Sequence, residues 1–264
     1  MSNRQFLLGL MSLLSAALVL AIIGRYTTLD LQLANAMFDF GAMRFPWQDH
    51  WFFADFLHHT VKALMLGVAL APAAALLVDR VTGHALLDKR TRSILLLITA
   101  SALLIALTIS VLKATSIHHC PWNLERYGGF APYLRLFDSL PPGVSAGHCF
   151  PAGHASSGLW LAAAAVFFLP GRPGRAVAAF LIGIVPGLAL GVGQQMRGAH
   201  FLTHTLWSAW IAAFVILVLA RLLIDASPVL DGAPVEPMNA QGDVAPGKSN
   251  QKEEPGFYPR KAAC

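Results

Sequence analysis

Long apolar runs alternate with short polar segments along most of the chain, and this pattern predicts a bundle of membrane-spanning helices. A helix crosses the hydrocarbon core of a bilayer with about 20 mostly apolar residues. Six runs approach this length, at 6–24, 61–78, 93–112, 156–170, 176–193 and 205–222. The fourth run is the shortest. We therefore expect an all-α integral membrane protein, a bundle of six transmembrane helices formed by residues 1–224.

The first apolar run has an alternative interpretation as a secretion signal, because Arg4 precedes it. The run from Phe6 to Gly24 is long for a signal core, and the small residues 15–17 lie inside it rather than after it. We therefore expect this run to remain in the protein as a helix.

The composition agrees with a membrane protein. Of the 264 residues, 56% are hydrophobic and 12% are charged, and the mean hydropathy is +0.58. These values are too apolar for an ordinary soluble domain. The formal charge of +5 comes from basic loops and from the candidate site below, so we do not interpret it as a signal for nucleic-acid binding.

Two segments differ from the apolar runs. Residues 25–59 are aromatic and amphipathic, which is typical of an interfacial or re-entrant helix in the region of the lipid headgroups. From Asp225 to Cys264 the chain is rich in Pro, Gly and polar residues and has no hydrophobic period. This composition predicts a disordered tail, on the cytoplasmic side if the orientation below holds.

Basic residues between the apolar runs predict the orientation in the membrane. They are Arg80, Lys89, Arg90 and Arg92 after the second run, Arg172 and Arg175 after the fourth, and Arg221 at the end of the sixth. The positive-inside rule places these positions and both termini in the cytoplasm. The loop 114–155 and the segment 194–204 then meet at the opposite face, the periplasmic face of an inner membrane.

Basic and histidine residues gather at this extracytoplasmic face. Lys113 ends the third run, and Pro-Ala-Gly-His at 151–154 precedes the fourth helix, where free backbone N–H groups form an anion cradle. The segment 194–204 carries Arg197 and two histidines. Each residue alone is compatible with a snorkelling lysine or an interfacial histidine. Ionisable groups at a membrane boundary are costly, so their coincidence at one face indicates a phosphate site.

These motifs, in this order, resemble the type-2 phosphatidic acid phosphatase superfamily, the integral membrane lipid phosphatases related to vanadium haloperoxidases. The family pattern is Lys-x6-Arg-Pro, Pro-Ser-Gly-His and Ser-Arg-x5-His-x3-Asp, and the resemblance covers about 60–220. It implies hydrolysis through a phosphohistidine, with His200 as nucleophile and His154 as general acid and then base. It implies no metal and no other cofactor.

The resemblance also assigns phosphate binding to Lys113 and to the turn that contains Ala152 and Gly153. Four positions depart from the family pattern: Cys120 and Gln194 replace arginines, Ala152 replaces serine, and His204 replaces aspartate. We expect Arg126 to replace the first arginine. We expect Arg197 to replace the second, if the fifth span stays helical to residue 200 and residues 194 and 197 share a face.

His204 follows His200 by four residues, which places the two on one face of a helix. A neutral imidazole can accept the N–H of His200, but it cannot stabilise an imidazolium as a carboxylate does. Glu125 and Asp138 are the candidates for that missing charge.

Cys120 and Cys149 both fall in the extracytoplasmic loop, where a disulfide is expected in an oxidising compartment; two free buried thiols are the alternative. Histidines in or beside the same loop also raise the question of a metal site. They are His118, His119, His148 and His154. Their spacing matches no common zinc pattern, so we expect no metal.

The expected function is hydrolysis of a lipid phosphomonoester or pyrophosphate, with the lipid phosphate and the bilayer as partners. The same intermediate also allows a phosphotransferase that passes the phosphoryl group to another lipid. The four departures leave open a non-catalytic binding or scaffold protein with a decayed site. Which lipid is the substrate, and whether the protein is oligomeric, stay open.

Overall fold

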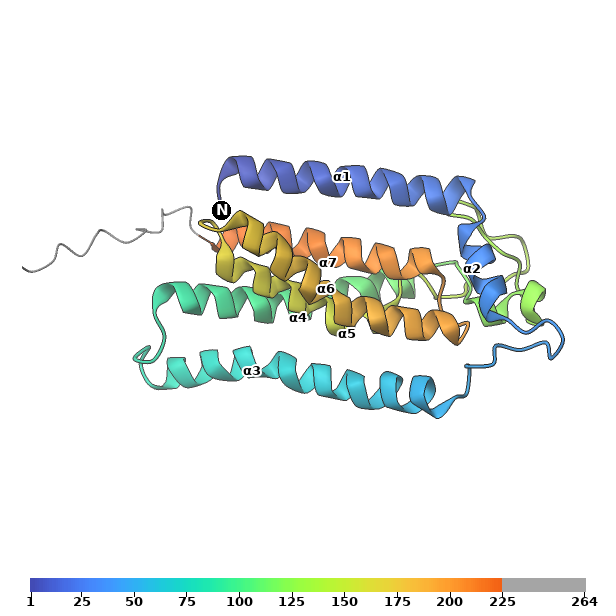
Figure 1. Ribbon diagram of the computed structural model, residues 1–264, viewed down its shortest axis with the longest axis horizontal. Coiled ribbons are helices and arrows are strands. Elements are labelled where there is room, and N and C mark those ends of the chain that lie inside the picture. The colour runs from blue at the N-terminus through green and yellow to red at the C-terminus, as the bar shows by residue number, and fades with distance from the viewer. Residues whose placement is uncertain (225–264) are drawn as a thin grey trace, which may run out of the picture. The chain divides into compact units, whose positions relative to one another are not determined.

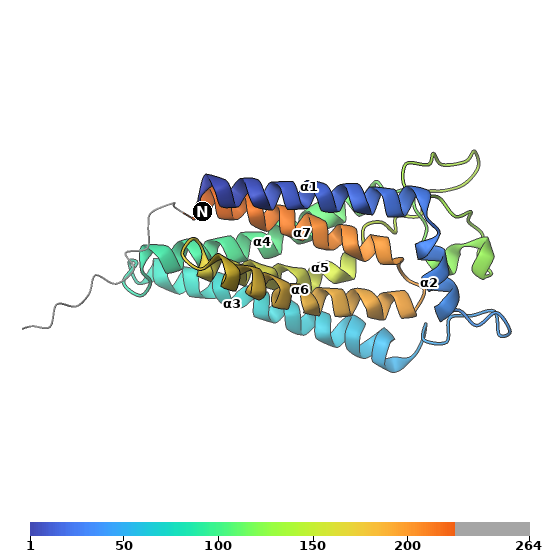
Figure 2. The same ribbon diagram turned by 45° about the horizontal axis from the view of Figure 1, so that its top comes forward.

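The computed structural model describes residues 1–224, and the regular structure in this part of the chain is helical. The long helices run side by side (Figures 1 and 2); they are α1 (Asn3–Tyr26), α3 (Lys62–Val81), α4 (Lys89–Ala114), α6 (Pro173–Met196) and α7 (Leu202–Leu223). The shorter helices are α2 (Leu29–Met37), α5 (Gly153–Leu159), a π-helix at Phe52–Val61 and 3₁₀ helices at Pro121–Asn123, Glu125–Tyr127 and Trp160–Phe168. The tail 225–264 lies outside the described residues.

Five helices in the described part are long and apolar enough to cross a membrane. They are Asn3–Tyr26, Phe52–Val81, Lys89–Ala114, Pro173–Met196 and Leu202–Leu223. They match five of the six expected runs, which confirms the expected all-α fold and is compatible with a multi-pass membrane protein. The fourth expected run corresponds to the shorter apolar helix Gly153–Phe168.

This short helix lies inside the bundle and packs closely on α6. A Cβ atom on Gly158 would lie 2.6 Å from the Gly187 nitrogen, and one on Gly183 would lie 2.6 Å from the Ala162 Cα. Such distances require glycine, because a side chain would separate the two backbones. Leu159 and Ala162 are fully buried. The close packing fixes the position of the start of α5, on which the candidate site is built.

The two ends of the bundle carry different segments. At one end the Met1 ammonium donates a hydrogen bond to the Ile224 carbonyl over 3.1 Å. The Gln5 side chain donates to the Pro170 carbonyl there over 3.0 Å. Helix α2 and the long loop between α4 and α5 lie at the other end (Figure 1).

The aromatic segment 25–59 contains buried rings and the start of the second long helix, and its place among the headgroups stays a prediction. Phe38 and Phe45 are buried against Tyr127 of the long loop, with ring centroids 4.9 Å and 5.3 Å from the Tyr127 ring. The helix of the second span begins at Phe52, so the end of the segment belongs to that span. The composition did not separate aromatic rings that fill a protein interior from those that stay exposed.

Candidate active site

The first two motifs meet where α4 ends and α5 begins. Lys113 lies in the last turn of α4, and a Cβ atom on Gly153 would lie 3.9 Å from its Nζ. Ala152 is the N-cap of α5 and provides no side-chain hydrogen bond to the first turn. The Lys113 ammonium therefore lies close to the uncapped N-terminus of α5, and this arrangement attracts anions.

The third motif lies in a turn that follows α6. The helix ends at Met196, and Gly198 has φ +73, in the left-handed region that favours glycine. A Cβ atom on Gly198 would lie 2.4 Å from ring atoms of Phe45. The condition that the fifth span stays helical to residue 200 therefore does not hold, because this turn redirects the chain before His200.

His200 lies between the second motif and the start of α7. Its side chain is 4% exposed, and its ring centroid lies 6.5 Å from that of His154 and 5.7 Å from that of His204. The Ala152 N–H donates to the His204 carbonyl over 3.1 Å, and the Ser208 hydroxyl donates to the Ala152 carbonyl over 3.0 Å. These two bonds hold the second and third motifs together.

The surroundings of His200 favour its neutral form. Burial lowers the pKa of His200 well below its usual value, and the nearby His204, Lys113 and His154 lower it further. The three titratable neighbours named here are all basic. An imidazole that stays neutral at pH 7 keeps a nitrogen lone pair, which a nucleophile requires.

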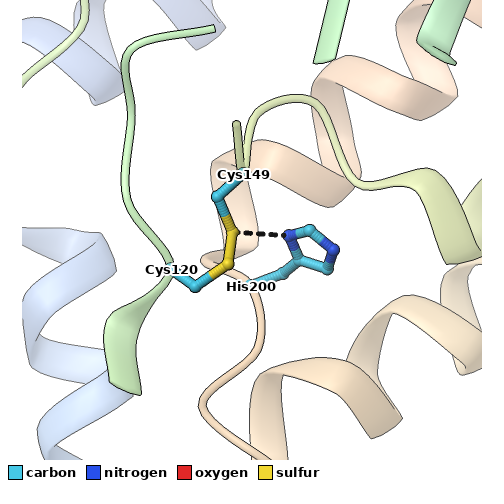
Figure 3. Close-up of side chains that lie close together, drawn as sticks. All are labelled: Cys120, Cys149 and His200. Atoms are coloured by element: carbon cyan, nitrogen blue, oxygen red, sulfur yellow. Dashed lines mark hydrogen bonds between the residues drawn. A yellow bond between two sulfur atoms is a disulfide. The ribbon is translucent and has the colours of Figure 1, made fainter. Parts of the chain in front are cut away.

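A disulfide joins Cys120 and Cys149 directly beside His200 (Figure 3). The Cα atoms of the two cysteines are 5.3 Å apart. Sγ of Cys149 lies 3.4 Å from Nδ1 of His200 and 3.1 Å from the Ala199 carbonyl oxygen. A disulfide sulfur carries no proton, so it can accept a hydrogen bond from His200 but cannot donate one to Ala199.

His204 does not have the position that the sequence predicted. Helix α7 begins at Leu202, so His200 and His204 are not on one helical face. Nδ1 of His200 faces the Cys149 sulfur, and Nδ1 of His204 has no hydrogen-bond partner in the described part of the chain. His204 instead lines a small cavity of about 20 Å³ with Asp30. We therefore correct the prediction that His204 accepts the N–H of His200.

The two candidate arginines bind groups of the protein. Arg197 donates from Nε to the Gln48 carbonyl over 2.8 Å and from a terminal nitrogen to the Gln194 side chain over 3.3 Å. Arg126 is exposed and donates to the Asn35 side chain over 2.8 Å. These bonds leave further N–H donors on each guanidinium, but no described contact brings either one to His200, so both assignments stay predictions.

Neither of the expected acids approaches His200. Asp138 pairs with Arg25 and accepts the Arg135 backbone N–H over 2.8 Å. The Arg135 backbone bond is the main reason why the pKa of Asp138 lies below its usual value. Glu125 is exposed. The expectation that one of them supplies a charge to His200 is wrong, because the loop fold directs both elsewhere.

The loop histidines have separate surroundings. His119 Nε2 lies 2.8 Å from the Ser145 carbonyl oxygen, and the His118 ring lies 5.4 Å from that of Phe150. His148 is exposed. Within residues 1–224, three residues place metal-binding atoms within 4.8 Å of one another: Cys120, Cys149 and His200. The two cysteine sulfurs of this group are bonded to each other in the disulfide.

Asp30, a buried acid in α2 that is 6% exposed, is not among the site residues predicted from the sequence. Its carboxylate accepts the Thr203 backbone N–H over 3.0 Å and also the Thr203 hydroxyl, so it caps the start of α7 from another helix. Burial raises the pKa of Asp30 above its usual value. One feature of the sequence indicates this residue, because Asp30 is the one acid between residues 25 and 38.

Replacing Asp30 with alanine should destabilise the start of α7 and reduce activity. Loss of a helix cap costs about 1 kcal/mol, and His200 and His204 flank the capped turn. Asp88→Ala is a matched control, because Asp88 caps α4 through the Thr91 N–H over 2.9 Å. Thermal unfolding should shift in both variants, but only Asp30→Ala should lower kcat. An equal kcat loss in both would contradict this local role of Asp30.

Comparison with known proteins identifies the family. A model of the PAP2 superfamily matches residues 93–227, which is half of the chain and contains all three motifs. The chain belongs to the PAP2 superfamily, whose members generally are phosphatases. No match was found among curated proteins or among solved structures.

Proposed function

We propose that this protein is a membrane-bound, metal-independent phosphatase that hydrolyses a lipid phosphomonoester or pyrophosphate through a phosphohistidine. The observation that carries the proposal is the position of His200, a buried imidazole with a lowered pKa that lies beside His154 and Lys113. Membership of the PAP2 superfamily supports the reaction class.

In the first step, the phosphoryl oxygens bind the Lys113 ammonium and the N–H groups at the start of α5. Nε2 of His200 attacks phosphorus, a P–N bond forms, and the P–O bond to the leaving group breaks. His154 transfers a proton to the departing oxygen. The positive charges at this site stabilise the negative charge of the transition state because the site is largely shielded from water.

In the second step, water replaces the leaving group. His154, which has lost its proton, accepts one from the attacking water. The new P–O bond forms as the P–N bond breaks, which releases inorganic phosphate and returns His200 to its neutral form. The ring separation of 6.5 Å between His154 and His200 supports this division of roles, because a phosphoryl group can lie between them.

We further propose six membrane crossings, with the short helix Gly153–Phe168 as the fourth, and a site on the periplasmic face of an inner membrane. Nine of its 16 residues form a 3₁₀ helix, which rises more per residue, so the helix is roughly 28 Å long. Basic residues at the end of the bundle with Met1 and Ile224 support a cytoplasmic location of both termini. The apolar surroundings favour a substrate that enters from the bilayer.

The test is phosphate release by detergent-purified protein from a panel of lipid phosphomonoesters and polyprenyl pyrophosphate in the presence of EDTA. Release that persists in EDTA and is lost in His200→Ala is the expected result. Loss of activity in EDTA, with recovery on adding a metal ion, would contradict the metal-independent mechanism.

A non-catalytic membrane-binding protein is the second candidate, because the described structure brings basic groups and no carboxylate to His200. Binding of a lipid phosphate that depends on Lys113, without release of phosphate from any lipid in the panel, would support it. Transfer of phosphate to a second lipid instead of water would indicate a phosphotransferase.

A further inference from the structure

The proposed nucleophile needs a partner that fixes its ring and its tautomer. For Nε2 to attack phosphorus, the proton of the neutral imidazole must lie on Nδ1, and a hydrogen-bond acceptor at Nδ1 favours that tautomer. The family pattern provides an aspartate, but this chain has His204 at that position. The titratable groups that act on His200 come from three helices and are basic: Lys113 from α4, His154 from α5 and His204 from α7.

The atom at Nδ1 is a sulfur. Sγ of Cys149 lies 3.4 Å from Nδ1 (Figure 3), within the distance of a hydrogen bond to sulfur. A disulfide sulfur is a weak acceptor without charge. It can therefore hold the ring and favour the proton on Nδ1, but it does not favour the imidazolium form as a carboxylate does.

The sulfur is held rigidly from two sides. Residues 116–118 and 147–149 pair through backbone hydrogen bonds, including Cys149 N–H to the His118 carbonyl over 2.9 Å. A Cβ atom on Gly147 would lie 2.5 Å from the His118 carbonyl oxygen, so this pairing requires glycine. Beyond Cys120, the Trp122 N–H donates to the Gly198 carbonyl over 3.0 Å. The disulfide thus links the two ends of the loop between the first two motifs. The turn of the third motif packs against this loop beside the disulfide.

We propose that the Cys120–Cys149 disulfide is the positioning group for His200, in place of the family aspartate, and that a dithiol reductant reversibly inactivates the protein through it. This inference rests on the proposed function. In the reduction, a small dithiol transfers two electrons and two protons to the protein. The S–S bond between Cys120 and Cys149 breaks, both become thiols, and the reductant becomes a disulfide.

Reduction changes the site in two ways. The Cys149 sulfur is no longer held by a covalent bond, so the His200 ring loses its fixed sulfur partner at Nδ1 and keeps only the hydrogen bond with the Cys149 backbone. A thiol can also ionise, and a thiolate beside an imidazole favours the protonated ring. His200 then keeps its proton at higher pH and lacks the lone pair for attack. As the pH is lowered, the reduced protein should therefore lose its activity at a higher pH than the oxidised protein does.

The experiment uses the full chain with Cys264→Ser, so that the disulfide is the one redox-active group. Activity is measured at pH values from 5 to 8. Reduction should lower kcat/KM at least about ten-fold at pH 7 and move the acid limb of the pH profile to higher pH. Oxidation should reverse both effects. The double variant Cys120→Ala, Cys149→Ala should have low activity. Adding the dithiol should change neither its rate nor the acid limb of its pH profile. A reduced protein with an unchanged rate and pH profile would overturn the proposal.

Two measurements distinguish a disulfide that positions His200 from one that only stabilises the fold. They also distinguish failure of this proposal from failure of the proposed function. If reduction lowers the melting temperature and the rate while the acid limb stays in place, the disulfide is only structural, and the proposal is wrong. Nitrogen NMR of labelled histidine should find the His200 proton on Nδ1 in the oxidised protein and a changed signal after reduction. That result in a protein that releases no phosphate would reject the proposed function but support the positioning role. A proton on Nε2 in the oxidised form would overturn it.

Discussion

Replacing His200 with alanine is expected to reduce phosphate release to the level of the uncatalysed reaction, a loss of roughly 10³-fold or more. The variant keeps Lys113 and the start of α5, so it should still bind the phosphate. It lacks the nitrogen that forms the P–N bond. Because the reaction is divided into two steps by that bond, its loss removes the whole route rather than weakening one contact.

The measurement is phosphate release with wild-type protein, His200→Ala and Ser139→Ala side by side. Ser139 lies in the loop between α4 and α5 and is exposed, so its replacement should leave kcat within about two-fold of wild type, as surface changes usually do. Acid-labile phosphate on the protein should be detected in the wild type and in Ser139→Ala. Its presence in His200→Ala would show that a different residue is the nucleophile.

Much of the fold could be predicted because the bilayer imposes a strong length requirement on apolar runs. Five of the expected spans correspond to long helices. The second helix begins at Phe52, before the expected apolar run, because the aromatic residues from Phe52 onward continue it. The fourth, the shortest expected run, corresponds to a helix of 16 residues, and glycines on α6 allow this helix to pack closely inside the bundle.

The site could be predicted only where the chemistry follows from order along the chain. Lys113, the turn at 151–154 and His200 occur in three motifs that the fold brings together. The contacts of His200 could not be predicted from spacing, because Gly198 turns the chain out of α6 and the i to i+4 relation with His204 does not exist. Asp30 caps α7 from a distant helix, and no local pattern reports such a contact.

The role of the disulfide shows the same limit. A disulfide between Cys120 and Cys149 is expected from their common loop, with free thiols as the alternative, and the structure contains the bond. Nothing in the spacing of the cysteines predicted that Sγ of Cys149 would lie at Nδ1 of His200. That contact depends on the backbone pairing of residues 116–118 with 147–149 and on the turn at Gly198, which are set by tertiary packing.

Replacing His154 with glutamine should slow the reaction by an amount that depends on the leaving group. General acid catalysis contributes about 10²- to 10⁴-fold, and it matters most when the departing oxygen is basic. An alkyl phosphate should therefore lose most of this factor in the first step. A nitrophenyl phosphate, whose oxygen leaves without a proton, should still form the phosphohistidine at nearly the normal rate.

The second step distinguishes this role from a general loss of structure. Because His154 also accepts the proton from water, the variant should hydrolyse its phosphohistidine slowly. Rapid-mixing experiments with nitrophenyl phosphate should then show a burst of nitrophenol followed by a slow steady rate, and the phosphoprotein should accumulate. Ser157→Ala, one turn further along α5, is the matched control and should show neither effect. An equal loss of rate for both substrates, without a burst, would mean that His154 supports the site without moving a proton.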